Sequence, residues 1–137
     1  MPLIQLTLSG TENLSLAKEL SAAISVLAAT VLNKRPEVTV VTVSFTPSQY
    51  WFINSESLAD LGKKSFHLSI RISDSTNLKN DKADYIAALH NTISKIVGDV
   101  HPVSYTAIDK MKADTYGYEG LTIEHKIIAN KLNALKK

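Results

Sequence analysis

A chain of 137 residues, of which 45% are hydrophobic and 20% charged, is typical of one globular domain and excludes extended disorder. The absence of cysteine excludes disulfide bonds, thiolate metal sites and cysteine nucleophiles. A net charge of only +2 gives no reason to expect a nucleic-acid or membrane partner.

Residues 2–46 have the pattern of a strand, a helix and a second strand. Apolar residues dominate positions 3–8, and the stretch Ser9–Asn13 is typical of a turn that starts a helix. Apolar side chains then recur at helical spacing from Leu16 to Val31, until Pro36 favours the end of the helix. The β-branched residues of 38–45 predict the second strand.

The most apolar stretch, residues 22–32, is too short to span a bilayer. The residues before it lack the basic start of a signal peptide. The lack of cysteine is compatible with a reducing compartment. We therefore expect a cytoplasmic protein without a membrane partner.

Residues 46–64 are expected to connect two similar halves. Tyr50–Phe52 could pair briefly as an edge strand, and the polar residues 54–64 predict a loop. Residues 66–73 alternate apolar and polar side chains, the period-two pattern of a strand with two unlike faces. A second helix is predicted from near Asn77 to Gly98, followed by a strand at 103–108. The expected apolar positions of this second helix are Ile86, Leu89, Ile93 and Ile96.

The order strand, helix, strand therefore occurs twice, over about residues 2–46 and 66–109. Because each βαβ crossover is right-handed and lays its helix on a shared sheet, the sequence predicts an α+β fold. We expect a four-stranded mixed sheet with two helices on one face, in a single domain of residues 1–137. A hook at 116–120 and an amphipathic helix over 122–136 follow, and this helix must cover its own sheet or a neighbouring subunit.

Pro2 is the candidate catalytic residue. Removal of Met1 would leave a secondary amine at the head of the first strand, and such an amine is a base when its pKa lies near neutrality. A retained Met1 would make the same nitrogen a tertiary amide without basicity. An inert proline that stiffens the start of the strand is the alternative.

A duplicated βαβ chain that opens with Pro2 resembles the tautomerase superfamily, which includes 4-oxalocrotonate tautomerase and macrophage migration inhibitory factor. Four short stretches are similar to the inhibitory-factor branch: Asn33–Pro36, His67–Ile70, Ile108–Met111 and Tyr118–Gly120. The resemblance implies a homotrimer with a pocket at each subunit interface and Pro2 at its floor. It also implies keto–enol isomerisation of a small α-keto or enol carboxylic acid, with no metal or organic cofactor.

The resemblance implies four further residues at the site. Lys34 matches a lysine whose charge lowers the pKa of the proline, and Ile70 matches a position whose backbone N–H donates to the ligand. Arg71 suits a substrate carboxylate, because a guanidinium binds it through two parallel hydrogen bonds, and an arginine on a polar strand face is the alternative. Tyr118 is a candidate aromatic wall, with a core or interface role as the alternative.

Two departures from the family patterns narrow the expected chemistry. The tyrosine and asparagine of the inhibitory-factor branch align with Ser104 and Thr106, so the substrate of that branch does not transfer. The dehalogenase branch has a histidine near the end of its first helix, and residues 28–33 contain none, which disfavours dehalogenation. The main alternative is a non-catalytic oligomeric binding protein with the same element order, in which Pro2 is inert.

Overall fold

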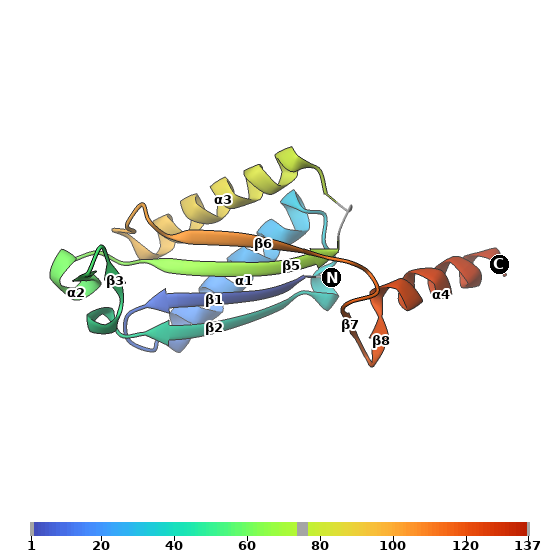
Figure 1. Ribbon diagram of the computed structural model, residues 1–137, viewed down its shortest axis with the longest axis horizontal. Coiled ribbons are helices and arrows are strands. Elements are labelled where there is room, and N and C mark those ends of the chain that lie inside the picture. Colours follow the sequence, from blue (N-terminus) through green and yellow to red (C-terminus); the bar gives the residue numbers. More distant parts are fainter. Residues whose placement is uncertain (1, 74–76, 137) are drawn as a thin grey trace.

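The computed structural model describes residues 2–73 and 77–136, whose arrangement is shown in Figure 1. Its main sheet has four strands in the order β2-β1-β5-β6. β1 pairs in parallel with β2, β5 pairs in parallel with β6, and β1 and β5 pair antiparallel at the centre. The strands are β1 (Leu3–Ser9), β2 (Val40–Thr46), β5 (Phe66–Ser73) and β6 (Tyr105–Met111).

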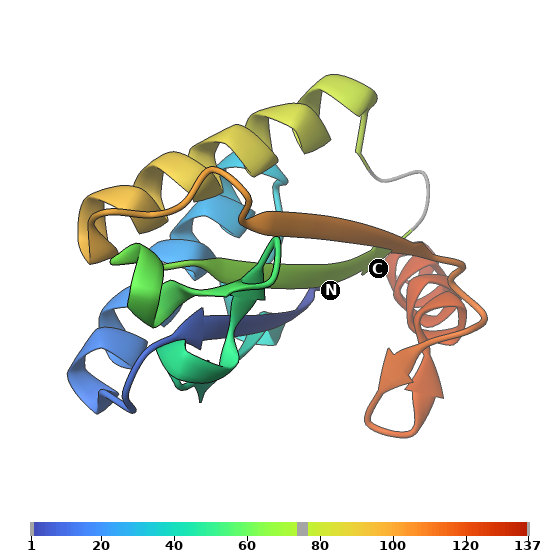
Figure 2. The ribbon, with the colours of Figure 1, turned by 60° about the vertical axis from the view of Figure 1, so that its left-hand side comes forward.

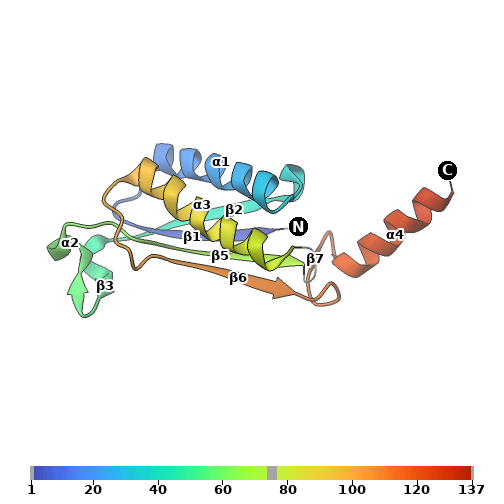
Figure 3. The same ribbon diagram turned by 90° about the horizontal axis from the view of Figure 1, so that it is seen from above.

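Two long helices, α1 (Leu14–Val31) and α3 (Lys79–Val97), join the parallel strand pairs and cover the same face of the sheet (Figure 3). Each helix buries a side chain at every fourth position, so one stripe faces the sheet. The predicted α+β fold class, a four-stranded mixed sheet with helices on one face, is confirmed. The buried positions are Leu20, Ile24 and Ala28 of α1 and Tyr85, Leu89 and Ile93 of α3.

The strands supply the other half of the core through their period-two pattern. Ile4 pairs across β1 and β5 with Ile70, and both side chains are fully buried against the helices. Alternate residues point to the opposite, uncovered face. One row of that face crosses the whole sheet and is polar or small: Thr42, Gln5, Ser69 and Ala107.

Several predicted boundaries shift for local reasons. Pro36–Val38 forms a short 3₁₀ helix, because proline suits the first position of a helix, and β2 therefore starts at Val40 rather than at residue 38. Helix α3 starts at Lys79, two residues after Asn77. The last main strand runs over 105–111 instead of 103–108.

Of the apolar positions expected for the second helix, Leu89 and Ile93 are buried, whereas Ile86 is 40% exposed and Tyr85 takes its place in the core. The predicted loop 54–64 was wrong in part. A hairpin joins β3 (Phe52–Ile53) to β4 (Glu56–Ser57) through two residues of positive φ, and α2 (Leu58–Leu61) follows.

By length and composition alone, α1 could cross a membrane, with 18 residues and a mean hydropathy of 1.5. It is longer than the apolar stretch that the sequence indicated. Its buried stripe packs against β1 and β5 in the core. Only 17% of the helix is buried inside the structure, and one such helix is weak evidence for a membrane span.

The C-terminal part of the chain leaves the sheet beyond β6. A second hairpin, β7 (Gly117–Tyr118) and β8 (Leu121–Thr122), is followed by α4 (Ile123–Leu135). Figures 1 and 2 show the hairpin and α4 together beyond the end of the sheet, near the start of β1. α4 occupies the predicted helical tail, but it projects away from the sheet instead of covering it.

Candidate functional site

A cavity of about 560 Å³ lies where the start of β1, the 3₁₀ turn and the β7–β8 hairpin meet. Pro2 is buried and lines this cavity. Its carbonyl oxygen accepts a hydrogen bond of 3.1 Å from the backbone N–H of Val40, which fixes the first described residue to the edge of β2. Apolar side chains form much of the remaining wall, including Leu3, Met111 and Ile123.

Arg71 lines the same cavity from β5. It lies directly opposite Leu3 in the antiparallel pairing of β1 and β5, one residue along the chain from Pro2. Strand alternation points its side chain to the uncovered face, whereas the neighbouring Ile70 points into the core. Within the described part of the chain, the guanidinium makes no ion pair or side-chain hydrogen bond, so its five donors can meet an anion.

Tyr118 forms a wall of the cavity from the β7–β8 hairpin. Glu119 and Gly120 both have positive φ, as a two-residue type I′ hairpin turn requires. Lys126 of α4 holds this wall from behind, with its Nζ 4.0 Å from the centroid of the Tyr118 ring and 2.8 Å from Oε1 of Glu119. The hydrogen bond from Lys126 lowers the pKa of the Glu119 carboxyl group.

Tyr116 is a wall residue that the sequence did not single out. Its hydroxyl lies 2.6 Å from Oγ of Ser73, and its carbonyl oxygen accepts a hydrogen bond from the N–H of Ile123. Burial raises the pKa of this phenol, and the hydrogen bond with Ser73 partly offsets the effect. The sequence indicated Tyr116 only as part of the short hook predicted at 116–120.

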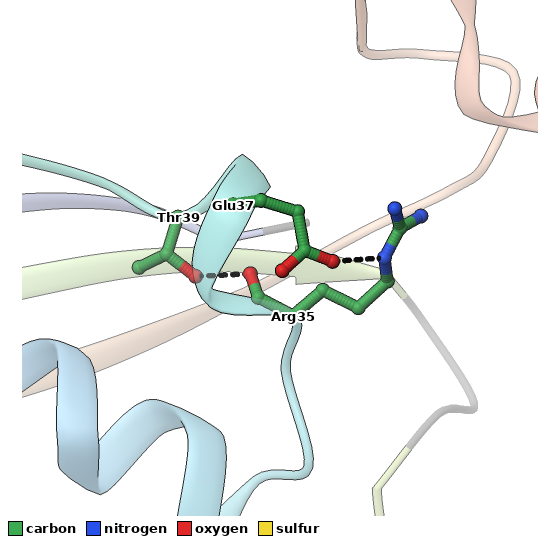
Figure 4. A network of polar contacts seen from close by, with 3 residues as sticks. All are labelled: Arg35, Glu37 and Thr39. Atoms are coloured by element: carbon green, nitrogen blue, oxygen red, sulfur yellow. Dashed lines mark hydrogen bonds and ion pairs between the residues drawn. The ribbon is translucent and has the colours of Figure 1, made fainter.

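Glu37 was also missed, and it places a carboxylate on the cavity wall. Figure 4 shows how its charge is held: Nε of Arg35 donates to Oε1 of Glu37 at 2.7 Å. The Arg35 carbonyl oxygen accepts a hydrogen bond of 2.7 Å from the hydroxyl of Thr39, which stabilises the turn. The hydrogen bond from Arg35 lowers the pKa of Glu37, and the guanidinium offsets its repulsion of an anionic ligand.

The structure brings Pro2, Arg71 and Tyr118 together but leaves Lys34 and Ile70 outside their cavity. Lys34 lines a neighbouring hollow of about 270 Å³, which shares Val38 and Ile123 as walls with the first cavity. Burial lowers the pKa of the Lys34 ammonium group. Ile70 is fully buried in a strand that is paired on both sides.

A metal-binding cluster was not expected from the sequence. Among residues 2–73 and 77–136, no group of three or more histidine, aspartate or glutamate side chains could hold a metal ion.

No family model matches the sequence, and no curated protein matches it either. Solved structures match over most of the chain. Native fused 4-OT has a TM-score of 0.79 at 17% identity, over 90% of this chain and 97% of its own. Pt0534 inactivated by 2-oxo-3-pentynoate has a TM-score of 0.76 at 11% identity, over 90% and 98% of the two chains.

A macrophage migration inhibitory factor-like protein from Entamoeba histolytica has a TM-score of 0.69 at 18% identity, over 88% of this chain and 97% of its own. Other fused 4-OT structures are symmetric and asymmetric trimers. At these identities the similarity establishes the fold. The chain therefore has the fold of fused 4-OT and of this macrophage migration inhibitory factor-like protein, the fold that its duplicated βαβ order and Pro2 led us to expect.

Proposed function

We propose that this chain is a keto–enol tautomerase that acts on a small α-keto or enol carboxylic acid, with Pro2 as the acid and base. The observation that carries the proposal is the place of Pro2, buried at a cavity of about 560 Å³ that also contains Arg71. Met1, whose removal the chemistry requires, lies outside the described residues.

The surroundings of Pro2 favour a neutral amine. A cavity with largely apolar walls disfavours the charged form of a base, and the positive charge of Arg71 on the same wall acts in the same direction. A neutral secondary amine can accept a proton, and the resulting ammonium can return it. Both steps of a proton transfer can then use one nitrogen.

The proposed reaction is a 1,3-proton transfer that needs no other reactant. The Pro2 nitrogen removes the proton from the carbon next to the keto group, and the electron pair of that C–H bond becomes the C=C bond of the enolate. The ammonium then delivers the proton to the enolate oxygen, which gives the enol. Arg71 would bind the substrate carboxylate and limit the build-up of negative charge.

The other elements of the proposal follow the resemblance and the trimeric fused 4-OT structures. We expect a cytoplasmic homotrimer in which a neighbouring subunit closes the open side of the cavity. Tyr118 would contact the substrate as an aromatic wall. Lys34, behind the shared wall, would act only through its charge, and Ile70 would shape the strand that presents Arg71.

The first test compares Pro2→Ala with the wild type in the conversion of enol to keto phenylpyruvate. Intact mass must show that Met1 is absent from both proteins, so that each has a free terminal amine. We expect the variant to be at least about tenfold slower, because its primary amine lacks the ring that fixes the position of the catalytic nitrogen. Equal rates would reject the catalytic role of Pro2, and the absence of turnover by both proteins would leave a binding protein with this fold.

The second test asks whether the nitrogen is a nucleophile. The neighbour Pt0534 is inactivated by 2-oxo-3-pentynoate, an α-keto acid with a triple bond. Addition of the Pro2 amine across that bond would form an N–C bond and move the amine proton to carbon, so the protein would gain the full mass of the reagent. A peptide map should place the adduct on Pro2, and labelling elsewhere would contradict the proposal.

A further inference from the structure

Helix α4 has an apolar face that its own domain does not cover. Ile123, at its first position, is 2% exposed and anchors the helix beside the cavity. Ile128, Leu132 and Leu135 follow at spacings of four and three residues, so they share one helix face. Their exposures are 52%, 55% and 81%, and we call these three residues the α4 stripe.

A second exposed apolar cluster lies at the opposite end of the molecule. It surrounds a hollow of about 500 Å³ between the β3–β4 hairpin and the first residues of β5 and β6. Figures 1 and 3 both show β3 at one end of the sheet and α4 beyond the other. We call this cluster the aromatic patch, and its exposed members are Tyr50 (70%), Phe52 (59%), Val103 (44%) and Tyr105 (71%).

We propose that the α4 stripe of one copy of this chain docks on the aromatic patch of a second copy. Fourteen large apolar side chains are exposed in the described part of the chain, and seven of them belong to these two surfaces. Such clusters are typical of interaction surfaces, whereas single exposed apolar residues are not. The hollow in the patch can accept side chains that project from a helix.

The positions of the two surfaces favour a closed ring of copies. A contact between one end of a chain and the opposite end of the next is heterologous, and it either closes into a ring or continues as a filament. Fused 4-OT, which aligns over 89% or more of this chain, forms trimers. In a trimeric ring, each of the three α4 stripes would cover one of the three aromatic patches.

The charge of α4 favours a second copy over an anionic membrane. An interfacial membrane helix is typically rich in lysine on its polar face. In α4, Lys126 is held by Glu119 and Tyr118, and its side chain is only 14% exposed. Glu124 lies in the same helix, and the described lysines that stay available for lipid phosphates are Lys131 and the C-cap residue Lys136.

Docking of α4 would also act on the cavity of its own chain. Lys126 links α4 to the wall formed by Tyr118 and Glu119. If a neighbouring copy fixes the position of α4, Lys126 also fixes the positions of Tyr118 and Glu119. If α4 moves freely, these two residues can move away from the cavity. In this arrangement Lys126 is a positioning residue.

A cross-linking experiment tests the contact directly, because the chain has no cysteine of its own. Chains with Leu132→Cys are mixed and re-equilibrated with chains carrying Tyr105→Cys, and the mixture is oxidised. The matched control replaces Tyr105→Cys by Val26→Cys, an apolar position of α1 that is 60% exposed. Since docking raises the local concentration of the thiols, we expect about tenfold more mixed disulfide than in the control.

Sedimentation of full-length variants gives a second measurement. The pair Ile128→Ser and Leu132→Ser should shift the protein from trimer toward monomer, whereas Val26→Ser should leave the trimer in place. Equal mixed disulfide in both mixtures would overturn the proposal. So would a Leu132→Cys chain that cross-links mainly to itself, or a monomeric wild type that binds anionic vesicles through α4.

Discussion

Removing the positive charge of Arg71 tests whether this residue binds the carboxylate of the proposed substrate. It lies on the uncovered face of β5, opposite Leu3, and its guanidinium has no ion-pair partner among the described residues. The substitution Arg71→Met keeps an unbranched side chain and removes the positive charge. Because this position is exposed, we expect the sheet and the position of Pro2 to be preserved.

The expected loss follows from the strength of a hydrogen bond to a charged group, about 1.5–3 kcal/mol. Each 1.36 kcal/mol of transition-state stabilisation changes the rate tenfold, so kcat/KM should fall about 10- to 150-fold. The open position of Arg71 in the single chain favours the lower end of this range, because water screens exposed charges. Closure of the cavity by a second copy would shift the loss toward the upper end.

The assay compares wild type and Arg71→Met on phenylpyruvate and on its methyl ester. The ester keeps the keto group and the ring but lacks the negative charge, so its kcat/KM should change less than about threefold. A selective loss on the acid supports a role in carboxylate binding. Equal losses on acid and ester would show a structural effect, and an unchanged rate on the acid would refute the reasoning.

Three further variants test the cavity wall and the neighbouring hollow. Gly117→Ala should lower kcat/KM about tenfold with little change in the thermal midpoint of the core, because the new Cβ would collide with the carbonyl oxygen of Leu121 and displace the wall. Lys126→Met should lower kcat/KM by up to about 30-fold, since a desolvated cation–π contact contributes about 2 kcal/mol and the Lys126 side chain is only 14% exposed. Burial lowers the pKa of Lys34, so its folded state binds fewer protons than the unfolded state at pH values just below 10.5. Wild type should therefore gain stability relative to Lys34→Met as pH rises through that range, and a parallel pH dependence of the two melting temperatures would contradict this.

The fold was predictable where the spacing of apolar residues is compatible with only one kind of secondary structure. Residues 66–73 alternate strictly, and the structure buries Phe66, Leu68, Ile70 and Ile72 on one face of β5. The apolar positions of α1 recur at helical spacing, and their buried stripe meets that face. Both patterns follow from the burial of one face, so they do not depend on distant parts of the chain.

The cavity was predictable only in part, because its walls come from distant segments. Pro2, Arg71 and Tyr118 were recognised from a resemblance between short stretches, and they do lie together. Tyr116 reaches Ser73 only because the β7–β8 hairpin folds back on the end of β5, and no local pattern in the chain indicates that contact. Lys34 was placed beside the proline by the same resemblance, but it lines a neighbouring hollow that shares Val38 and Ile123 as lining residues with the cavity of Pro2.

The place of Pro2 also bears on the choice between a reactive and an inert proline. The ends of a chain are usually exposed and loosely held, yet Pro2 is buried and bonded through its carbonyl oxygen to Val40. A proline that only stiffened the start of β1 would be best served by close packing, because protein interiors gain contacts when such spaces are filled. Here about 560 Å³ lies open beside Pro2, and the same wall holds Arg71, which has no ion pair among residues 2–73 and 77–136. Open apolar volume beside Pro2 and a cationic side chain suits the anionic substrate that we propose, and it brings no packing benefit to an inert residue.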